Sequence, residues 1–221
     1  MHVNAGSPRR APRKGQHVAV DTQDFIAKYP KLLHLADAQS WPSIEEHGLL
    51  SAAEIVRRWQ VPAREAQELL AKKRPEPVYL DHHELGRAVL RDQHPLREHL
   101  LAPALTGGMT VETWLRTLNS FVFFFTSQDR LRRLHSAYSD VPAVLLTIKT
   151  RSLVQGHEGR IRLAGMNTGY TGRRVKERGA ETFLPIKRHT LKAPVQEVVV
   201  LDEVSDLSDH LISAELLTAP R

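Results

Sequence analysis

The chain of 221 residues contains no cysteine, which excludes disulfides, thiolate chemistry and thiolate metal sites. This lack suits a reducing compartment, so we expect the protein to be cytoplasmic. No apolar run approaches the roughly 20 residues that a membrane span needs. The N-terminus also lacks the apolar segment of a secretory signal. We therefore expect no membrane partner.

Acidic residues are missing from residues 1–20, which carry four lysines and arginines. Residues 147–192 carry eleven lysines and arginines against three acids, whereas the rest of the chain is mildly acidic. Localised positive charge attracts phosphates. Residues 1–20 lack hydrophobic periodicity, so we predict a disordered basic tail, and a solvated tail is the simpler interpretation of its charge.

Residues 21–221 predict a single α+β domain, because one strand and several helices are followed mostly by strands rather than by a regular alternation. The predicted helices cover residues 24–29, 43–47, 52–59, 63–73, 95–105, 111–118, 128–137 and 207–216. The predicted strands cover residues 32–36, 78–80, 121–125, 143–149, 160–163 and 195–201.

Three polar residues lie in or beside apolar strands: His34, Arg130 and Glu197. With a period of two, Val195, Glu197 and Val199 share one face of the last strand, and an ionised carboxylate there is costly if it is buried without a partner. Periodicity alone slightly favours a solvent-facing Glu197. A lone histidine on an apolar strand is, in the same way, more often a core residue than a ligand.

Metal and nucleotide motifs are largely missing. Asp81-His82-His83-Glu84 offers ligand types, but adjacent histidines point to different sides, so a surface turn is the better interpretation. We recognise no distant set of histidines and acids with ligand spacing and expect no metal. Among the motifs searched, no Walker loop, GxGxxG, GxSxG or HExxH occurs.

Several segments nevertheless follow a known pattern. They are Leu33-His34-Leu35, Ser40–Ile44, Gly48-Leu49-Leu50, Asn119–Thr126 and Gln196–Val200. In this order they resemble the first strand-helix motif, the second aromatic strand and the last, glutamate-led strand of DarT-type DNA ADP-ribosyltransferases. In that family an arginine follows the aromatic strand, and here Arg130 stands about one residue later than the pattern expects.

Other segments resemble an uncharacterised bacterial family of the same fold. They are Arg91–Pro95, Trp114 with Leu118-Asn119, Asn167–Gly169, and Arg178-Gly179 followed by Thr182-Phe183. Together the two resemblances cover most of residues 30–210.

The resemblance implies an ADP-ribosyltransferase-like split mixed sheet with a helical insertion between the first and second motif strands. It implies an enzyme that uses NAD as co-substrate, transfers ADP-ribose to DNA or RNA and releases nicotinamide. Glu197 is then the catalytic residue. The implied cofactor-binding residues are His34, Arg91, Arg130, Asn167 and Thr182, with Arg91 and Arg130 as alternatives for the pyrophosphate. The implied acceptor-binding residues are Tyr170, Arg173, Arg174 and Arg178.

This interpretation requires His34 and Glu197 to face one cleft with an arginine nearby. It implies a monomeric toxin or defence effector with an antitoxin or a hydrolase as its protein partner. Two alternatives stay open: an RNA 2′-phosphotransferase, which also consumes NAD but does not need the same glutamate, and a non-catalytic nucleic-acid-binding module on the same fold.

Overall fold

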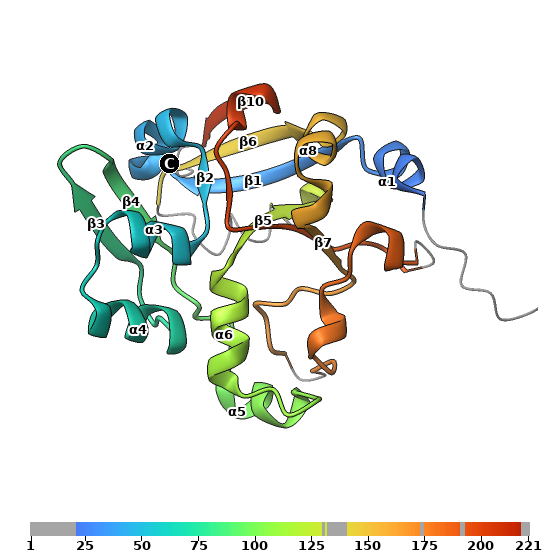
Figure 1. The fold of residues 1–221 in the computed structure, drawn as a ribbon, viewed down its shortest axis with the longest axis horizontal. Helices are drawn as coiled ribbons and strands as arrows, with labels where there is room; N and C mark the ends of the chain where they lie inside the picture. The colour runs from blue at the N-terminus through green and yellow to red at the C-terminus, as the bar shows by residue number, and fades with distance from the viewer. Residues whose placement is uncertain (1–20, 130, 132–140, 173–174, 191–192, 218–221) are drawn as a thin grey trace, which may run out of the picture.

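The computed structural model describes residues 21–129, 131, 141–172, 175–190 and 193–217 (Figure 1). A six-stranded sheet forms its centre. The strand order is β10 (Leu211–Leu217), β6 (Ala143–Lys149), β1 (Lys31–Asp37), β5 (Phe121–Phe125), β8 (Glu197–Leu201) and β7 (Ile161–Ala164). The predicted α+β class is confirmed. Every strand pairing within this sheet is antiparallel, so the expectation of a mixed sheet is wrong.

Helices separate β1 from β5 in the chain, as expected. They are accompanied by a β-hairpin, of which only the first strand was predicted. The helices are α2 (Trp41–His47), α3 (Ala52–Arg58), α4 (Ala63–Ala71), α5 (Glu98–Leu101) and α6 (Val111–Asn119). The hairpin consists of β3 (Val78–His82) and β4 (Gly86–Leu90). In Figure 1, α2, α3, α4 and the hairpin gather at one side of the sheet, and α5 and α6 lie below it.

Strands β1, β6 and β8 are buried on both faces because they carry apolar residues at consecutive positions, whereas the edge strand β10 is largely exposed. On one face Leu32, Phe124 and Leu146 join the largest core. On the other face Val199 packs with the buried side chains of α6, which begins at the N-cap Thr110. The core therefore lies on both sides of β5 and β8.

A tight turn joins α2 to the rest of the domain. Gly48 ends α2 with a φ of 78°, and a Cβ there would lie 2.2 Å from the carbonyl oxygen of Val204. Only glycine fits this approach, which lets β2 (Leu49–Leu50) pair with β9 (Glu203–Val204). Ser51 then caps α3 by accepting a hydrogen bond from the Glu54 backbone.

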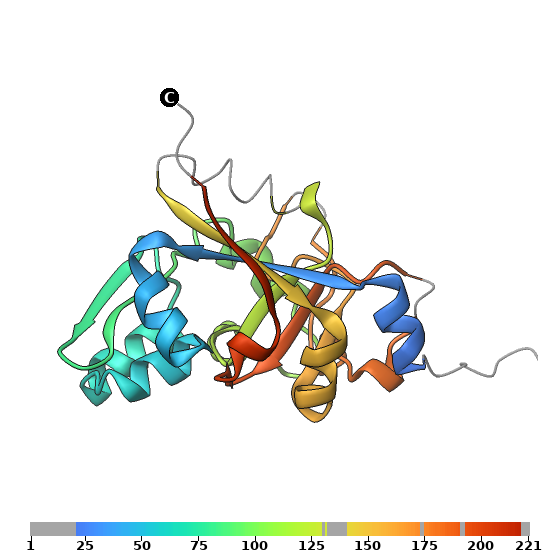
Figure 2. The ribbon, with the colours of Figure 1, turned by 90° about the horizontal axis from the view of Figure 1, so that it is seen from above.

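Two elements differ from the prediction. The helix predicted at residues 207–216 is wrong, because β10 pairs along the edge of β6 and satisfies its backbone groups (Figure 2). Helix α8 (Thr150–His157) directly follows β6 and was not predicted. The helix predicted at residues 128–137 falls largely outside the described residues, as does the tail of residues 1–20.

The remaining elements are short. Helix α1 (Thr22–Lys28) precedes β1 and is capped by Asp21. The 3₁₀ helices are η1 (Ala38–Ser40), η2 (Ala102–Ala104), η3 (Glu158–Arg160), η4 (Ala180–Thr182), η5 (Ile186–Arg188) and η6 (Leu207–Asp209). Among the described residues, none of the helices has the length and apolar character that crossing a membrane requires.

Candidate functional site

His34 lies on β1 at the point where this strand separates from β5. The two strands share one register pair, Leu33 with Phe125. One residue further, the Nδ1 atom of His34 lies 2.7 Å from the carbonyl oxygen of Phe123. Because a carbonyl can only accept, Nδ1 carries the proton and Nε2 is left as an acceptor. Burial lowers the pKa of His34 to about 4, so the imidazole is neutral at pH 7.

A cavity of about 160 Å³ lies along the part of β1 that comes after the Leu33–Phe125 pair. Its walls come from β1, α2, α3 and β4, and His34 and Ser43 contribute polar atoms. Three arginines also line it: Arg74, Arg87 and Arg91. The charge of Arg91 reaches His34 and helps to lower its pKa, after burial as the main cause. The structure therefore brings together two of the predicted cofactor residues, His34 and Arg91.

Glu197 is the first residue of β8 and is only 3 % exposed. The expectation that it faces solvent is wrong, because its strand is buried on both faces. Thr168 holds the carboxylate with its hydroxyl, 2.7 Å from Oε2, and with its backbone N–H, 3.1 Å from the same oxygen. These donors stabilise the charged form of a buried acid.

The side chains of His34 and Glu197 point to opposite faces of the sheet. Leu33, Phe125 and Glu197 are paired in one row across β1, β5 and β8, and directly paired residues point to the same face. His34 follows Leu33 and points to the other face, where its ring lies 5.8 Å from that of Phe124. The expectation that both residues face one cleft is therefore wrong. The row spans two strand spacings, about 10 Å.

The residues predicted to contact the acceptor fall on the Glu197 side. Arg178 is buried, and its guanidinium donates to the carbonyl oxygens of Lys176 at 3.0 Å and Tyr170 at 2.5 Å. Burial lowers the pKa of Arg178, and the nearby charge of Glu197 opposes this. Arg178 thus holds its own segment together, and its expected contact with an acceptor stays a prediction. The Tyr170 side chain, in contrast, is 53 % exposed.

Asn167 and Thr182 also lie away from His34. The Asn167 backbone accepts from Arg178, and the Thr182 hydroxyl accepts from the Gly179 N–H at 2.9 Å. Thr182 lines a second cavity of about 390 Å³, and neither residue lines the cavity beside His34. Three other predicted site residues lie outside the described residues: Arg130, Arg173 and Arg174.

The sequence reasoning missed a cluster of potential metal ligands. His157, Asp206 and His210 bring their side chains together, although we expected no such set. The spacing of Asp206 and His210, four residues apart, is a signal that the sequence carried. His157 could not have been added to them without the fold, because it lies 49 residues before Asp206.

Comparison with known proteins gave one match. A model described as "Family of unknown function (DUF7002)" matches residues 30–211. Searches of curated proteins and of solved structures found no match.

Proposed function

The chain belongs to the DUF7002 family of unknown function, and we propose from the arrangement of its own residues that it is an NAD-dependent ADP-ribosyltransferase acting on a nucleic acid. One observation carries the proposal: the three strands that resemble the motif strands of that fold lie side by side in the order β1, β5, β8. Glu197 lies in the same row across these strands as Leu33, and His34 is the residue after Leu33.

In this proposal the cavity beside β1 binds one end of the dinucleotide. Neutral His34 accepts a hydrogen bond from a ribose hydroxyl through Nε2, because Nδ1 is engaged by Phe123. Arg91 lines the same cavity and offers a planar fork of donors to the pyrophosphate. The cavity is smaller than the about 300–1,000 Å³ of a typical ligand pocket, so it takes a part of NAD and not the whole.

Glu197 acts at the other end of the dinucleotide. The glycosidic bond of NAD breaks and nicotinamide leaves with the bonding electron pair, so positive charge develops on the ribose. A fixed carboxylate stabilises that charge and takes the proton of the attacking acceptor atom as its bond to the ribose forms. The structure does not meet the requirement that Glu197 and His34 face one cleft, so the proposal requires the ribose of NAD to pass around the end of β5 to reach both residues. The segment that carries Thr168 must also uncover the carboxylate.

Nicotinamide release from NAD tests the proposal, with single- and double-stranded DNA and RNA as acceptors. We expect Glu197→Gln to reduce the rate at least about thirtyfold, which corresponds to about 2 kcal/mol of lost transition-state stabilisation. Glu215→Gln on the exposed side of β10 is the matched control and retains the rate. The proposal fails if the wild-type protein releases no nicotinamide with any acceptor, or if Glu197→Gln keeps full activity.

A second candidate, a nucleotide-binding module without catalysis, is favoured by the placement of His34 and Glu197 on opposite faces. Protection by NAD against thermal unfolding separates the two. A module predicts protection that His34→Ala abolishes and Glu197→Gln leaves intact, without nicotinamide release. The enzyme predicts turnover in addition to protection.

A further inference from the structure

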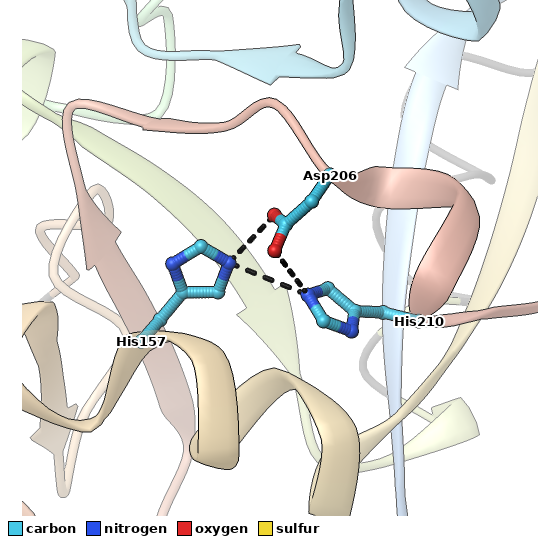
Figure 3. Close-up of side chains that lie close together, drawn as sticks. All are labelled: His157, Asp206 and His210. Carbon is cyan, nitrogen blue, oxygen red and sulfur yellow. Dashed lines mark hydrogen bonds and ion pairs between the residues drawn. The ribbon is translucent and has the colours of Figure 1, made fainter.

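Three side chains from two distant parts of the chain meet beside the sheet, as Figure 3 shows. His157 ends α8, whereas Asp206 and His210 flank η6 before β10. The Nε2 atom of His157 lies 2.7 Å from Asp206 Oδ1, and the Nε2 atom of His210 lies 3.2 Å from Asp206 Oδ2. The two Nε2 atoms are 3.3 Å apart.

The hydrogen atoms of the cluster cannot satisfy all three contacts. Arg160 donates to His157 Nδ1 at 2.6 Å, so the neutral His157 ring carries its proton on Nε2 and donates it to Asp206. If His210 also carries a proton on Nε2, two N–H groups face each other. If it does not, its lone pair faces the carboxylate, and its proton sits on Nδ1, which is buried without a hydrogen-bond partner.

A cation between the three groups removes this conflict. Two ligands about 2.0–2.1 Å from a tetrahedral ion are about 3.3 Å apart, which matches the separations that His210 makes with both of the other groups. Two imidazoles and one carboxylate are a donor set suited to zinc and other divalent transition metals. The histidines are 5 % and 4 % exposed, whereas Asp206 is partly exposed and leaves a path for a water ligand.

We propose that His157, Asp206 and His210 bind one divalent cation of the zinc class, with water as the fourth ligand. The ion ties the end of α8 to the segment before β10. This site is independent of the NAD chemistry proposed above.

Arg160 competes with the ion. When His157 binds a metal through Nε2, its proton moves to Nδ1, and the guanidinium that donates to Nδ1 must turn away. Arg160 can retain its other contact, to the carbonyl oxygen of Leu201 at 3.3 Å. Arg160→Leu should therefore bind the metal at least as tightly as the wild-type protein.

Metal titration of the full chain tests the site, with any affinity tag removed and the protein first stripped with a chelator. We expect one equivalent of Zn²⁺ in competition with a fluorescent chelator. His157→Ala and His210→Ala should each weaken binding at least about a hundredfold, beyond the about 10–100-fold loss typical of outer-shell changes. His83→Ala is the matched control, because His83 is exposed at the hairpin, and it should bind as the wild type does.

Two further measurements do not depend on the folding of the histidine variants. Co²⁺ bound to the wild-type protein should give the intense visible absorption of a tetrahedral site, and Zn²⁺ should raise its Tm with increasing concentration. Asp206→Asn keeps the shape of the side chain and should weaken binding. Absence of stoichiometric binding to the wild type, or equal binding by the His83 and His157 variants, would overturn the proposal.

Discussion

At the scale of single residues, His34 and Glu197 are ionisable groups that the sheet holds in opposite ways. The charged form of Glu197 receives two hydrogen bonds from Thr168. His34 is instead held neutral, because burial disfavours its charged form and Arg91 adds a repulsive charge. His34 therefore stays neutral at pH 7, which is the state that its proposed role as a hydrogen-bond acceptor needs.

The depressed pKa of His34 predicts a loss of stability in mild acid. The folded state holds the pKa near 4 and the unfolded state near 6.5, so the unfolded chain binds more protons between these values. Stability is therefore fully present above pH 6.5 and falls as the pH drops toward 4. Between pH 7 and pH 5 the contribution of His34 amounts to at most about 2 kcal/mol.

Urea unfolding at pH 7 and pH 5 measures this loss. We expect the wild-type protein to lose more free energy of unfolding than His34→Gln, which lacks the titrating group. Other histidines, such as His189 with its lowered pKa, contribute equally to both proteins. Parallel losses in the two proteins would show that His34 is not held neutral by the fold.

The sequence predicted which residues of the site are unusual, but not where they point. His34 and Glu197 stood out because polar residues in apolar strands need a structural reason. Their faces depend on the register between β1, β5 and β8, in which a shift of one residue reverses the direction of each side chain. Register is fixed by packing between distant segments, and no local pattern in this chain encoded it.

At the scale of elements, a polar network joins α4, α6 and the segment after β4 within the helical insertion. Arg74 follows α4 and donates to the side chain of Asn119 at the end of α6, at 3.0 Å, and to the backbone of Arg91. Asn119 in turn donates to the carbonyl oxygen of Leu70 at 2.9 Å. Burial lowers the pKa of Arg74 to about 10, which leaves it charged at neutral pH. The network thereby positions the arginine side of the cavity beside His34.

Removing the amide at the centre of this network should be costly. We expect Asn119→Ala to lower the free energy of unfolding by about 1–3 kcal/mol, because a buried guanidinium donor and a partly buried carbonyl lose their partner. Urea unfolding measures the change. The matched control on the same helix is Arg116→Ala, whose exposed ion pair with Glu112 is worth less than about 0.5 kcal/mol. Equal losses for the two variants would contradict the role of the network.

The element predictions were correct where local sequence signals decide the structure. Capping residues and breakers such as Ser51, Gly48 and Pro30 marked the first strand and helices near their observed bounds. Strand β10 was mistaken for a helix because its backbone is paired by β6, more than 60 positions earlier in the chain. Pairing with a distant edge overrides local propensity.

At the scale of the whole molecule, the proposed nucleic-acid partner rests on the uneven distribution of charge along the chain. The basic stretch of residues 147–192 spans α8, β7 and the segment that precedes β8. Part of this charge is already engaged within the chain: Arg178 is buried, and Arg188 pairs at the surface with Glu181 at 2.8 Å. The basic surface available to a nucleic acid is thus smaller than the number of lysines and arginines in residues 147–192 indicates. Tyr170 remains as an exposed aromatic side chain within this stretch.

Tyr170 therefore gives the sharpest test of nucleic-acid binding. If bases stack on its ring, Tyr170→Ala should weaken binding to single-stranded DNA or RNA by about 1–3 kcal/mol and leave the Tm unchanged. Tyr79→Ala is the matched control, because Tyr79 is similarly exposed, at 44 %, but lies on the β3–β4 hairpin. Fluorescence anisotropy at several salt concentrations measures both variants, and the wild-type affinity should fall steeply as salt rises, since phosphate contacts release counterions. Equal affinities for the wild-type and Tyr170→Ala proteins would exclude this stretch as a base-stacking surface.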